Sequence, residues 1–246
     1  MNRASRFDRL ELLIGASALA RLAQSAVTVF GVGGVGSFAA EGLARSGIGR
    51  ITLVDHDLVE LSNINRQIQA LDETVGKPKV EMMADRCRSI NPDAMVRALQ
   101  VRYAADTADR LLDPAADYIL DCIDQVTAKL HLIQACRESN LPIISSMGAA
   151  NKLDPAGIRV ADICETHKCG LARIMRRELR RRGITEGVKV VYSTESPRTP
   201  FPAKIMEDTE AAVRRAPLGS SSFIPPLFGM TMAGTVIRAL LDKENP

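Results

Sequence analysis

The chain has 246 residues and a formal charge of +3, with 46% hydrophobic and 25% charged residues. This composition excludes a disordered chain, which would contain fewer apolar residues and more net charge. The length allows one large α/β domain, or one domain with an extension. The five cysteines are odd in number and form no CxxC pair, which argues against a disulfide framework and a four-cysteine zinc site.

The N-terminal sequence lacks the apolar segment of a signal peptide. No run of about 18 apolar residues predicts a transmembrane helix. The nearest candidate, residues 225–241, is interrupted by Arg238 and by small residues. We therefore expect a cytoplasmic protein without membrane contact.

Strands and helices alternate along the first part of the chain, after a helical arm over residues 1–25. This alternation predicts a Rossmann-like α/β fold, a mainly parallel sheet with helices on both faces. The predicted strands are 26–31, 50–55, 95–101, 117–124 and 141–146, and the predicted helices are 37–47, 76–90 and 126–140.

The pattern changes after residue 148. Two further predicted strands, 158–163 and 188–193, flank a very basic helix. Residues 195–222 are rich in proline, glycine and serine and predict a mobile loop, and an apolar helix closes the chain over 229–241. We therefore divide the chain into the arm (1–25), a core (26–148) and a smaller C-terminal extension (149–246).

A glycine-rich loop joins the first predicted strand to the helix that follows. Such glycines let the backbone turn tightly and approach a phosphate, and the helix N-terminus supplies free N–H groups. Asp55 ends the next strand, 19 residues after the last glycine, where an acid can bind ribose hydroxyls. The motif predicts a nucleotide site; the alternative is a packed turn without a ligand. The loop glycines are Gly31, Gly33, Gly34 and Gly36.

Further polar residues fall at the same edge of the predicted sheet. Ser62, Asn63, Asn65, Arg66 and Gln67 follow the second strand, Lys79 begins a helix, and Asp124 ends the fourth strand. A triphosphate needs such cations and usually a metal, for which a carboxylate is a suitable ligand. Taken singly, Arg66 and Lys79 could be surface cations and Asp124 a helix N-cap. No GxxxxGK[ST] sequence occurs, so a P-loop is excluded.

Four motifs, GVGGVG, VDHDLVELSNINRQ, GKPKVE and DCID, resemble in order and spacing the ATP-dependent adenylating enzymes related to ubiquitin-activating enzyme, the ThiF/MoeB family. The resemblance covers residues 6–148. It implies ATP and Mg²⁺ as cofactors and a homodimer, in which an arginine of the arm, Arg9 rather than Arg6, reaches the partner subunit's ATP. It also implies Asp55 on ribose, Asn63, Arg66 and Lys79 on the phosphates and Asp124 on Mg²⁺, with Asp57 and Gln67 in the same site.

The second half of the chain is similar by pattern to one branch of that family, whose members dehydrate threonylcarbamoyladenosine in tRNA. The branch implies that ATP activates the threonyl carboxylate as an adenylate. Attack from within the same side chain then closes a ring and releases AMP. This chemistry needs no strong general base, which agrees with only three histidines and no serine–histidine pattern. The predicted catalytic residues are Arg9, Arg66, Lys79 and Asp124.

The basic helix is the predicted contact with tRNA. Residues 159–182 contain eight basic and three acidic residues, a net charge of +5. A cationic helix face suits a phosphate backbone, although such faces are also common as solvated surface. Aromatic residues are scarce nearby, which favours phosphate over base contacts. The candidate tRNA-binding residues are Arg173, Arg176, Arg177, Arg180 and Arg181.

Cys164, His167 and Cys169 lie close together in the sequence, but a metal site would lack a fourth ligand. Some relatives use a cysteine to hold a thioester with a carrier protein, although dehydration does not require one. Cys169 is the only candidate for that role, because it lies in a polar, basic setting that could lower the pKa of its thiol. We expect the other three cysteines, Cys87, Cys122 and Cys136, to be core residues.

Three rival functions explain part of this sequence, and one of them is a nucleotide-sensing regulatory protein without catalysis. An activator of a ubiquitin-like sulfur-carrier protein would use the same ATP site, with sulfur-transfer proteins as partners, but such activators often carry CxxC zinc motifs. An NAD-dependent oxidoreductase explains the glycine loop and Asp55, but leaves Arg66, Lys79 and Asp124 without a role.

Overall fold

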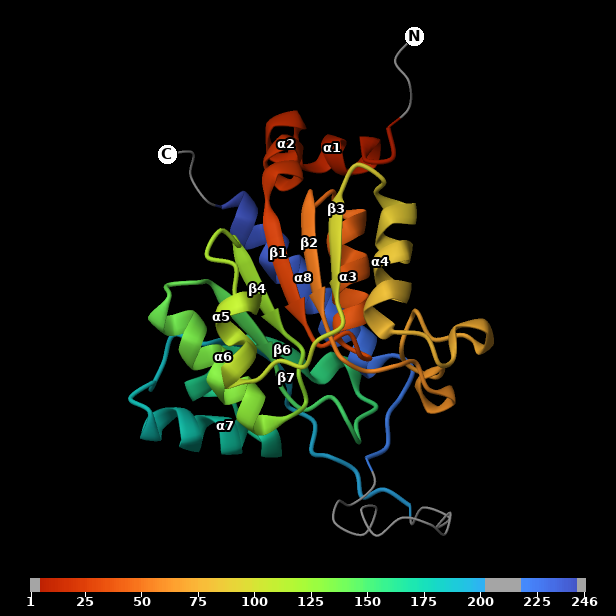
Figure 1. Cartoon of the computed structure of the whole chain (residues 1–246). Coiled ribbons are helices and arrows are strands. Elements are labelled where there is room, and N and C mark those ends of the chain that lie inside the picture. The colour runs from red at the N-terminus through yellow and green to blue at the C-terminus, as the bar shows by residue number, and fades with distance from the viewer. Residues whose placement is uncertain (1–4, 202–217, 243–246) are drawn as a thin grey trace.

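The computed structural model describes residues 5–201 and 218–242. Its seven strands are β1 Ala26–Phe30, β2 Arg50–Val54, β3 Met95–Leu99, β4 Tyr118–Asp121, β5 Ile143–Ser146, β6 Ile158–Asp162 and β7 Lys189–Ser193. They form one sheet in the order β3-β2-β1-β4-β5-β7-β6 (Figure 1). All neighbours pair in parallel except β6 and β7. The predicted mainly parallel α/β fold is confirmed.

The described residues form eight α-helices: α1 Asp8–Ile14, α2 Ala16–Gln24, α3 Gly36–Arg45, α4 Lys79–Ile90, α5 Ala108–Leu111, α6 Val126–Glu138, α7 Gly170–Arg181 and α8 Ile224–Leu241. Short 3-10 turns lie at Leu61–Asn63, Asp72–Thr74, Ala105–Thr107, Pro155–Gly157 and Ile163–Glu165. Helices α3, α4 and α8 share one hydrophobic core with the sheet, and α5, α6 and α7 share another on the opposite face.

The predicted C-terminal extension joins the same sheet. β7 pairs in parallel with β5, and β6 then pairs with β7 as the antiparallel edge strand. The basic helix predicted between these strands is α7. Of the loop predicted over 195–222, residues 202–217 lie outside the described residues, and the described flanks, 195–201 and 218–222, contain no helix or strand.

Helix α8 begins five residues earlier than the sequence predicts. Pro225 and Pro226 occupy its first turn, where a missing backbone N–H leaves no hydrogen bond unmade. The prolines therefore start this helix, and the predicted start at residue 229 was five residues too late. By length and composition α8 could cross a membrane, but half of it is buried inside the protein, as in a core helix.

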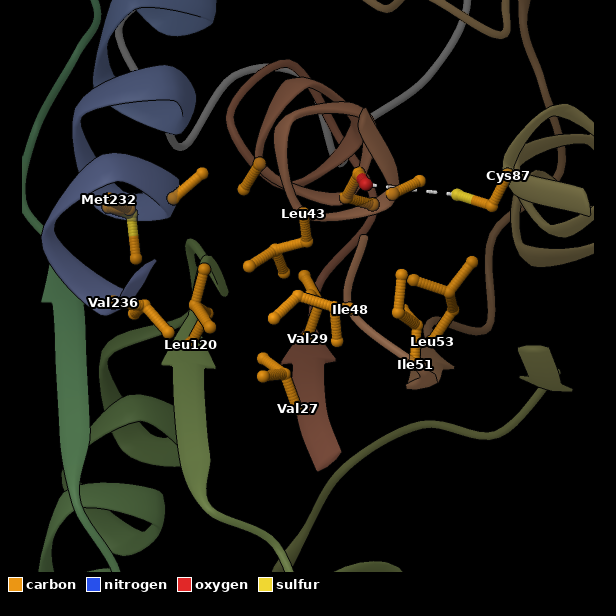
Figure 2. Close-up of a cluster of buried hydrophobic side chains, with 14 of the residues drawn as sticks. Val27, Val29, Leu43, Ile48, Ile51, Leu53, Cys87, Leu120, Met232 and Val236 are labelled. Atoms are coloured by element: carbon orange, nitrogen blue, oxygen red, sulfur yellow. Dashed lines mark hydrogen bonds between the residues drawn. The ribbon is translucent and has the colours of Figure 1, made fainter. Parts of the chain in front are cut away.

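Helices α3 and α8 approach closely because each contributes a glycine to the contact. A Cβ on Gly229 would lie 2.2 Å from the carbonyl oxygen of Val35, and one on Gly42 would lie 2.9 Å from Cβ of Ala233. Figure 2 shows Met232 and Val236 of α8 in the core that α3 and the strands share. The C-terminal helix is therefore packed directly against the helix that begins at the glycine loop.

Candidate nucleotide-binding site

The glycine loop links the carboxyl end of β1 to α3 in a tight turn that leaves no room for a side chain at its first and last glycines. Gly31 has a φ of +86°, and a Cβ there would lie 2.8 Å from the carbonyl oxygen of Cys122. A Cβ on Gly36 would lie 1.8 Å from the carbonyl oxygen of Gly31. Glycine is therefore required at both ends of the loop by the path of the backbone. Gly33, in contrast, faces open space, with Nε2 of Gln67 its nearest neighbour at 3.9 Å.

The N-terminus of α3 presents unused hydrogen-bond donors. No side chain caps the helix. Among the described residues, the N–H groups of Gly33, Gly34, Val35 and Gly36 have no hydrogen-bond acceptor. Free N–H groups at the positive end of a helix dipole form a binding site for an anion such as a phosphate.

Asp55 follows β2 and supports this loop directly. Its Oδ2 accepts a hydrogen bond from the N–H of Val32 at 2.6 Å, and its Oδ1 accepts one from the N–H of Asp57 at 2.9 Å. The carboxylate therefore lies beside the glycine loop, at the position predicted for an acid that contacts ribose. The Asp55 carboxylate also fixes the backbone at Val32 and at Asp57.

The polar segment after β2 folds back onto the glycine loop. A Cβ on Gly34 would lie 3.3 Å from the carbonyl oxygen of Arg66 and 3.4 Å from its Cγ. The guanidinium of Arg66 donates to the carbonyl of Ser62 at 2.8 Å and to Oδ1 of Asn65 at 3.0 Å. Asn63 is buried, and its Oδ1 accepts the N–H of Glu60 at 3.1 Å. The structure thus brings Arg66 and Gln67 to the loop, while Asn63 holds the segment's own turn.

Lys79 is the first residue of α4, and its side chain is largely buried. Its Nζ lies 2.8 Å from Oδ2 of Asp57. His56 lies between the two aspartates, with Nε2 3.3 Å from Oδ1 of Asp57. The two predicted residues, Asp57 and Lys79, are therefore brought together as an ion pair.

Asp124 lies in the turn between β4 and α6. Its side chain is exposed and has no hydrogen bond or ion pair among the described residues. Gln125 occupies the N-cap position of α6, so Asp124 is not the helix cap. Asp121, in the same motif, is fully buried. The motif therefore contributes one carboxylate to the surface at the carboxyl edge of the sheet and keeps the other inside.

The N-terminal arm lies at the opposite end of the molecule. Figure 1 shows α1 and α2 beyond the amino ends of the strands, whereas the glycine loop follows the carboxyl end of β1. Arg6 is held within the chain, since its guanidinium donates to the carbonyl of Ile90 at 3.1 Å. Arg9 is exposed. Arg9 therefore lies far from the glycine loop of its own chain.

The five predicted tRNA-binding arginines all lie on α7, but they are not equivalent. Arg173, Arg177, Arg180 and Arg181 are exposed. Arg176 is half-buried, and its guanidinium donates to the carbonyl and the hydroxyl of Thr166. Arg176 therefore joins α7 to the preceding turn and does not belong to an open cationic face.

Glu178 lies among the exposed arginines of α7. Its Oε1 accepts from Arg177 at 2.9 Å and from Arg181 at 3.0 Å. The hydrogen bond from Arg177, followed by the charge of Arg181, holds the pKa of the Glu178 carboxyl below its ordinary value. Two of the candidate arginines are thus paired within the helix.

All five cysteines are free, as predicted. Cys169 is buried, with Sγ near the backbone of Gly148 and Lys152 close enough to interact with it electrostatically, so the predicted basic neighbour is present but the polar setting is not. Cys164 is exposed, and a hydrogen bond with Asp162 raises the pKa of its thiol. Cys164, His167 and Cys169 do not converge: among the described residues, the group of metal-type ligands that meets is Asp55, His56 and Asp57.

Sequence reasoning missed two buried residues at this edge. Gln69 donates from Nε2 to the carbonyl of Val32 at 2.7 Å and thereby supports the glycine loop. Lys129 of α6 forms a fully buried ion pair with Asp121. A lysine between apolar residues of a helix was the available signal for the second, since charged side chains are seldom buried without a partner.

Comparison with known proteins gives the family. The ThiF family model matches residues 7–246. The tRNA threonylcarbamoyladenosine dehydratase of Bacillus subtilis is 47% identical over 240 residues, which cover 96% of this chain and 94% of that protein. The crystal structure of the Escherichia coli tRNA N6-threonylcarbamoyladenosine dehydratase in complex with ATP matches with a TM-score of 0.86 and 34% identity, over 97% of this chain and 94% of that one.

Other members of the family match a shorter segment. The molybdopterin-synthase adenylyltransferase of Salmonella typhimurium is 37% identical over 133 residues, 54% of this chain and 52% of that protein. The resemblance found in the four motifs is confirmed. The chain belongs to the ThiF family of adenylating enzymes, in the branch that contains the tRNA threonylcarbamoyladenosine dehydratases.

Proposed function

We propose that the chain is an ATP-dependent tRNA-modifying enzyme that dehydrates threonylcarbamoyladenosine by way of an adenylate. The observation that carries this proposal is the extent of the similarity. The dehydratases match over almost the whole chain, whereas the molybdopterin-synthase adenylyltransferase matches about half of it. The similarity to the dehydratases therefore includes the C-terminal segment. We expect this segment to hold the substrate contacts that distinguish dehydratases from adenylyltransferases.

The glycine loop is the proposed phosphate site. Its free N–H groups would hold phosphate oxygens, and Asp55 would accept ribose hydroxyls while it keeps the loop in place. Arg66 and Lys79 would neutralise charge on the departing pyrophosphate, with Asn63, Gln67 and Asp57 arranging the surrounding segments. The triphosphate, unlike the pyrophosphate of NAD, gives both cations a role.

Asp124 is the proposed ligand for Mg²⁺. It is an exposed carboxylate without a partner among the described residues, in the turn whose backbone adjoins Gly31. Mg²⁺ is usually held by one or two carboxylates together with substrate phosphates, so this donor fits the ion. When bound, Mg²⁺ would offset the negative charge of the phosphates during adenylation.

The reaction follows from what the site can hold. A carboxylate oxygen of the threonyl group attacks the α-phosphorus of ATP, and the bond to pyrophosphate breaks. A nucleophile of the same side chain then attacks the carbonyl carbon and loses its proton, and AMP leaves with the carboxylate oxygen. The net change is loss of one water. Because the first nucleophile is already an anion, the protein contributes alignment and charge stabilisation.

We infer a homodimer in which Arg9 completes the site of the partner subunit. Arg9 is exposed and lies beyond the amino ends of the strands, so it cannot reach the glycine loop of its own chain. Leu12 and Leu13 of the same helix are about four-fifths exposed, at 81% and 80%. Exposed leucines on a short helix favour burial against another surface.

The exposed arginines of α7 are the proposed contact with tRNA, through phosphates. We infer a cytoplasmic enzyme, because tRNA is its substrate. A sulfur-transfer protein stays a predicted partner, since related adenylating enzymes of the family act on sulfur carriers.

The decisive experiment is incubation with ATP, Mg²⁺ and tRNA that carries threonylcarbamoyladenosine. We expect release of AMP together with loss of one water mass from the modified nucleoside. Parallel reactions contain unmodified tRNA or a small sulfur-carrier protein with a Gly-Gly terminus. AMP release that requires the carrier protein and not the modified tRNA would refute the proposal.

A further inference from the structure

Lys129 carries an ammonium group that lies wholly inside the protein. Its Nζ lies 2.7 Å from Oδ2 of Asp121, and neither side chain is exposed to solvent. Nζ also donates to the carbonyl of Asp121 at 3.4 Å and to Oγ of Ser145 at 3.1 Å. The hydroxyl of Ser145 donates in turn to Oδ2 of Asp121 at 2.6 Å. Each proton of the ammonium therefore has an acceptor, as a buried charge requires.

This network lies where it can fix the position of α6 relative to the strands. A buried ion pair adds little net stability, because removing both charges from water offsets their attraction. Its three members come from different elements: Asp121 is the last residue of β4, Ser145 belongs to β5 and Lys129 to α6. The network therefore fixes how α6 lies against the carboxyl ends of two neighbouring strands.

The turn that follows β4 is held between this network and the glycine loop. Oδ1 of Asp121 accepts the N–H of Ile123 at 3.2 Å. On the other side, the N–H of Cys122 donates to Phe30 at 2.8 Å, and the backbone of Cys122 adjoins Gly31. The backbone of Cys122 and Ile123 is thus fixed from both sides. Asp124 is the next residue.

We propose that Lys129 is a positioning residue for the magnesium–nucleotide site: through Asp121 it fixes the turn from which Asp124 extends. The inference rests on the proposed function, in which Asp124 binds Mg²⁺. The Asp124 side chain has no partner among the described residues, so its placement comes from the backbone before it. Mg²⁺ demands near-ideal octahedral geometry, so a displaced carboxylate binds it more weakly.

The test compares Lys129→Met with Leu132→Ala. Leu132 is fully buried on the same helix but lies outside the network, so its truncation reports general damage to α6. For each purified full-length variant, calorimetry measures the affinity for a non-hydrolysable ATP analogue in Mg²⁺ and in EDTA. A Mg²⁺ titration of AMP release with modified tRNA gives the metal midpoint. Ser145→Ala is the milder variant, which keeps the ion pair if Lys129→Met fails to fold.

We expect Lys129→Met to raise the Mg²⁺ midpoint about 10-fold or more, the range for residues that orient metal ligands. It should leave the affinity in EDTA unchanged. Ser145→Ala should shift the Mg²⁺ midpoint less. Leu132→Ala should lower the melting temperature and leave the Mg²⁺ midpoint unchanged. A wild-type midpoint in both network variants, or an equal shift in Leu132→Ala, would overturn the inference.

Asp124→Asn separates this inference from the function on which it rests. A raised midpoint in Asp124→Asn together with a wild-type midpoint in Lys129→Met and Ser145→Ala refutes the role of Lys129 alone. A wild-type midpoint in Asp124→Asn refutes the magnesium assignment, and the role of Lys129 with it.

Discussion

The ammonium of Lys79 lies 2.8 Å from the carboxylate of Asp57, and the backbone N–H of Lys79 donates to the carbonyl of Asp57 at 3.0 Å. The two residues are unequally placed, since the lysine side chain is 8% exposed and the aspartate 49%. Asp57 therefore supplies the counter-charge to a buried cation from the solvent side. It also joins the end of β2 to the start of α4.

We predict that Asp57→Asn destabilises the nucleotide-free protein more than the ATP-bound protein. The substitution leaves the Lys79 cation without an anion, at a cost of about 1–3 kcal/mol in unfolding free energy. Bound phosphate would replace that anion, so saturating ATP should narrow the difference in melting temperature from wild type. Asp85→Asn, which removes an exposed pair with Arg88, is the control and should change little. A difference that ATP leaves unchanged or widens contradicts the prediction.

We predict opposite outcomes for alanine at two glycines of the same loop. Gly36→Ala places Cβ 1.8 Å from a backbone oxygen, so the loop must move, and we expect loss of ATP binding and at least about 3 kcal/mol of stability. In Gly33→Ala the new Cβ has no neighbouring atom closer than 3.9 Å, so the variant should have the same free energy of unfolding as the wild type. Chemical denaturation and nucleotide binding check both variants. Equal destabilisation would mean that the loop path is not as described.

We predict that Arg9 acts across the dimer. Arg9→Ala and Lys79→Met should each be inactive as homodimers, because each lacks one part of every site. After mixing and subunit exchange, heterodimers contain one site with both residues intact, so activity should recover to about one quarter of wild type. AMP release measures the recovery, and mass spectrometry of the intact dimers confirms the exchange. No recovery in confirmed heterodimers would place Arg9 in its own subunit's site, and an active Arg9→Ala homodimer would place it outside catalysis.

We predict that Glu178 limits the affinity of α7 for tRNA. Glu178→Gln releases Arg177 and Arg181 from an internal carboxylate, so tRNA should bind more tightly at low salt. The slope of log affinity against log salt should steepen by about 1 for each new phosphate contact. Arg180→Glu should weaken tRNA binding and spare ATP binding, whereas Arg97→Glu on the edge strand β3 should leave both unchanged. Equal losses in the two arginine variants would remove α7 from the interface.

We predict that thiol labelling of the native protein is confined to Cys164 and is slow at neutral pH. The hydrogen bond with Asp162 raises the thiol pKa, so the reactive thiolate accumulates only above the ordinary value of about 8.5. Burial raises the pKa of Cys87 and of Cys136 to about 12, and both side chains are inaccessible. Alkylation rates across pH, followed by peptide mapping, check this. Labelling of Cys164→Ser in its native state would contradict it.

Local patterns predicted the parts of the fold that depend on local physics. Apolar β-branched segments formed the strands, and the closely spaced glycines formed the tight turn between β1 and α3, because each follows from a few neighbouring residues. Asp55 was placed correctly beside the glycine loop for the same reason: it directly follows the adjacent parallel strand. The roles of the site residues in catalysis stay predictions until the variants are measured.

Tertiary contacts decided the remainder. Cys169 lies among polar and basic residues in the sequence, but it is buried in the fold near Gly148. Arg176 has the spacing of a surface residue, yet Thr166 accepts its guanidinium. The partners of Lys129 lie 8 and 16 residues away, on two different strands. No periodicity in the sequence predicts these contacts, because they form only once the sheet has folded.

The packing of α8 has a consequence for when the nucleotide site can exist during synthesis of the protein. A Cβ on Gly34 would lie 3.1 Å from Cβ of Pro225, so the last helix backs the glycine loop itself. The segment that supplies the loop leaves the ribosome early, while the segment that buttresses it leaves nearly two hundred residues later. A nascent chain therefore exposes the loop without its support until α8 has been synthesised, and competence to bind ATP arises only after that point.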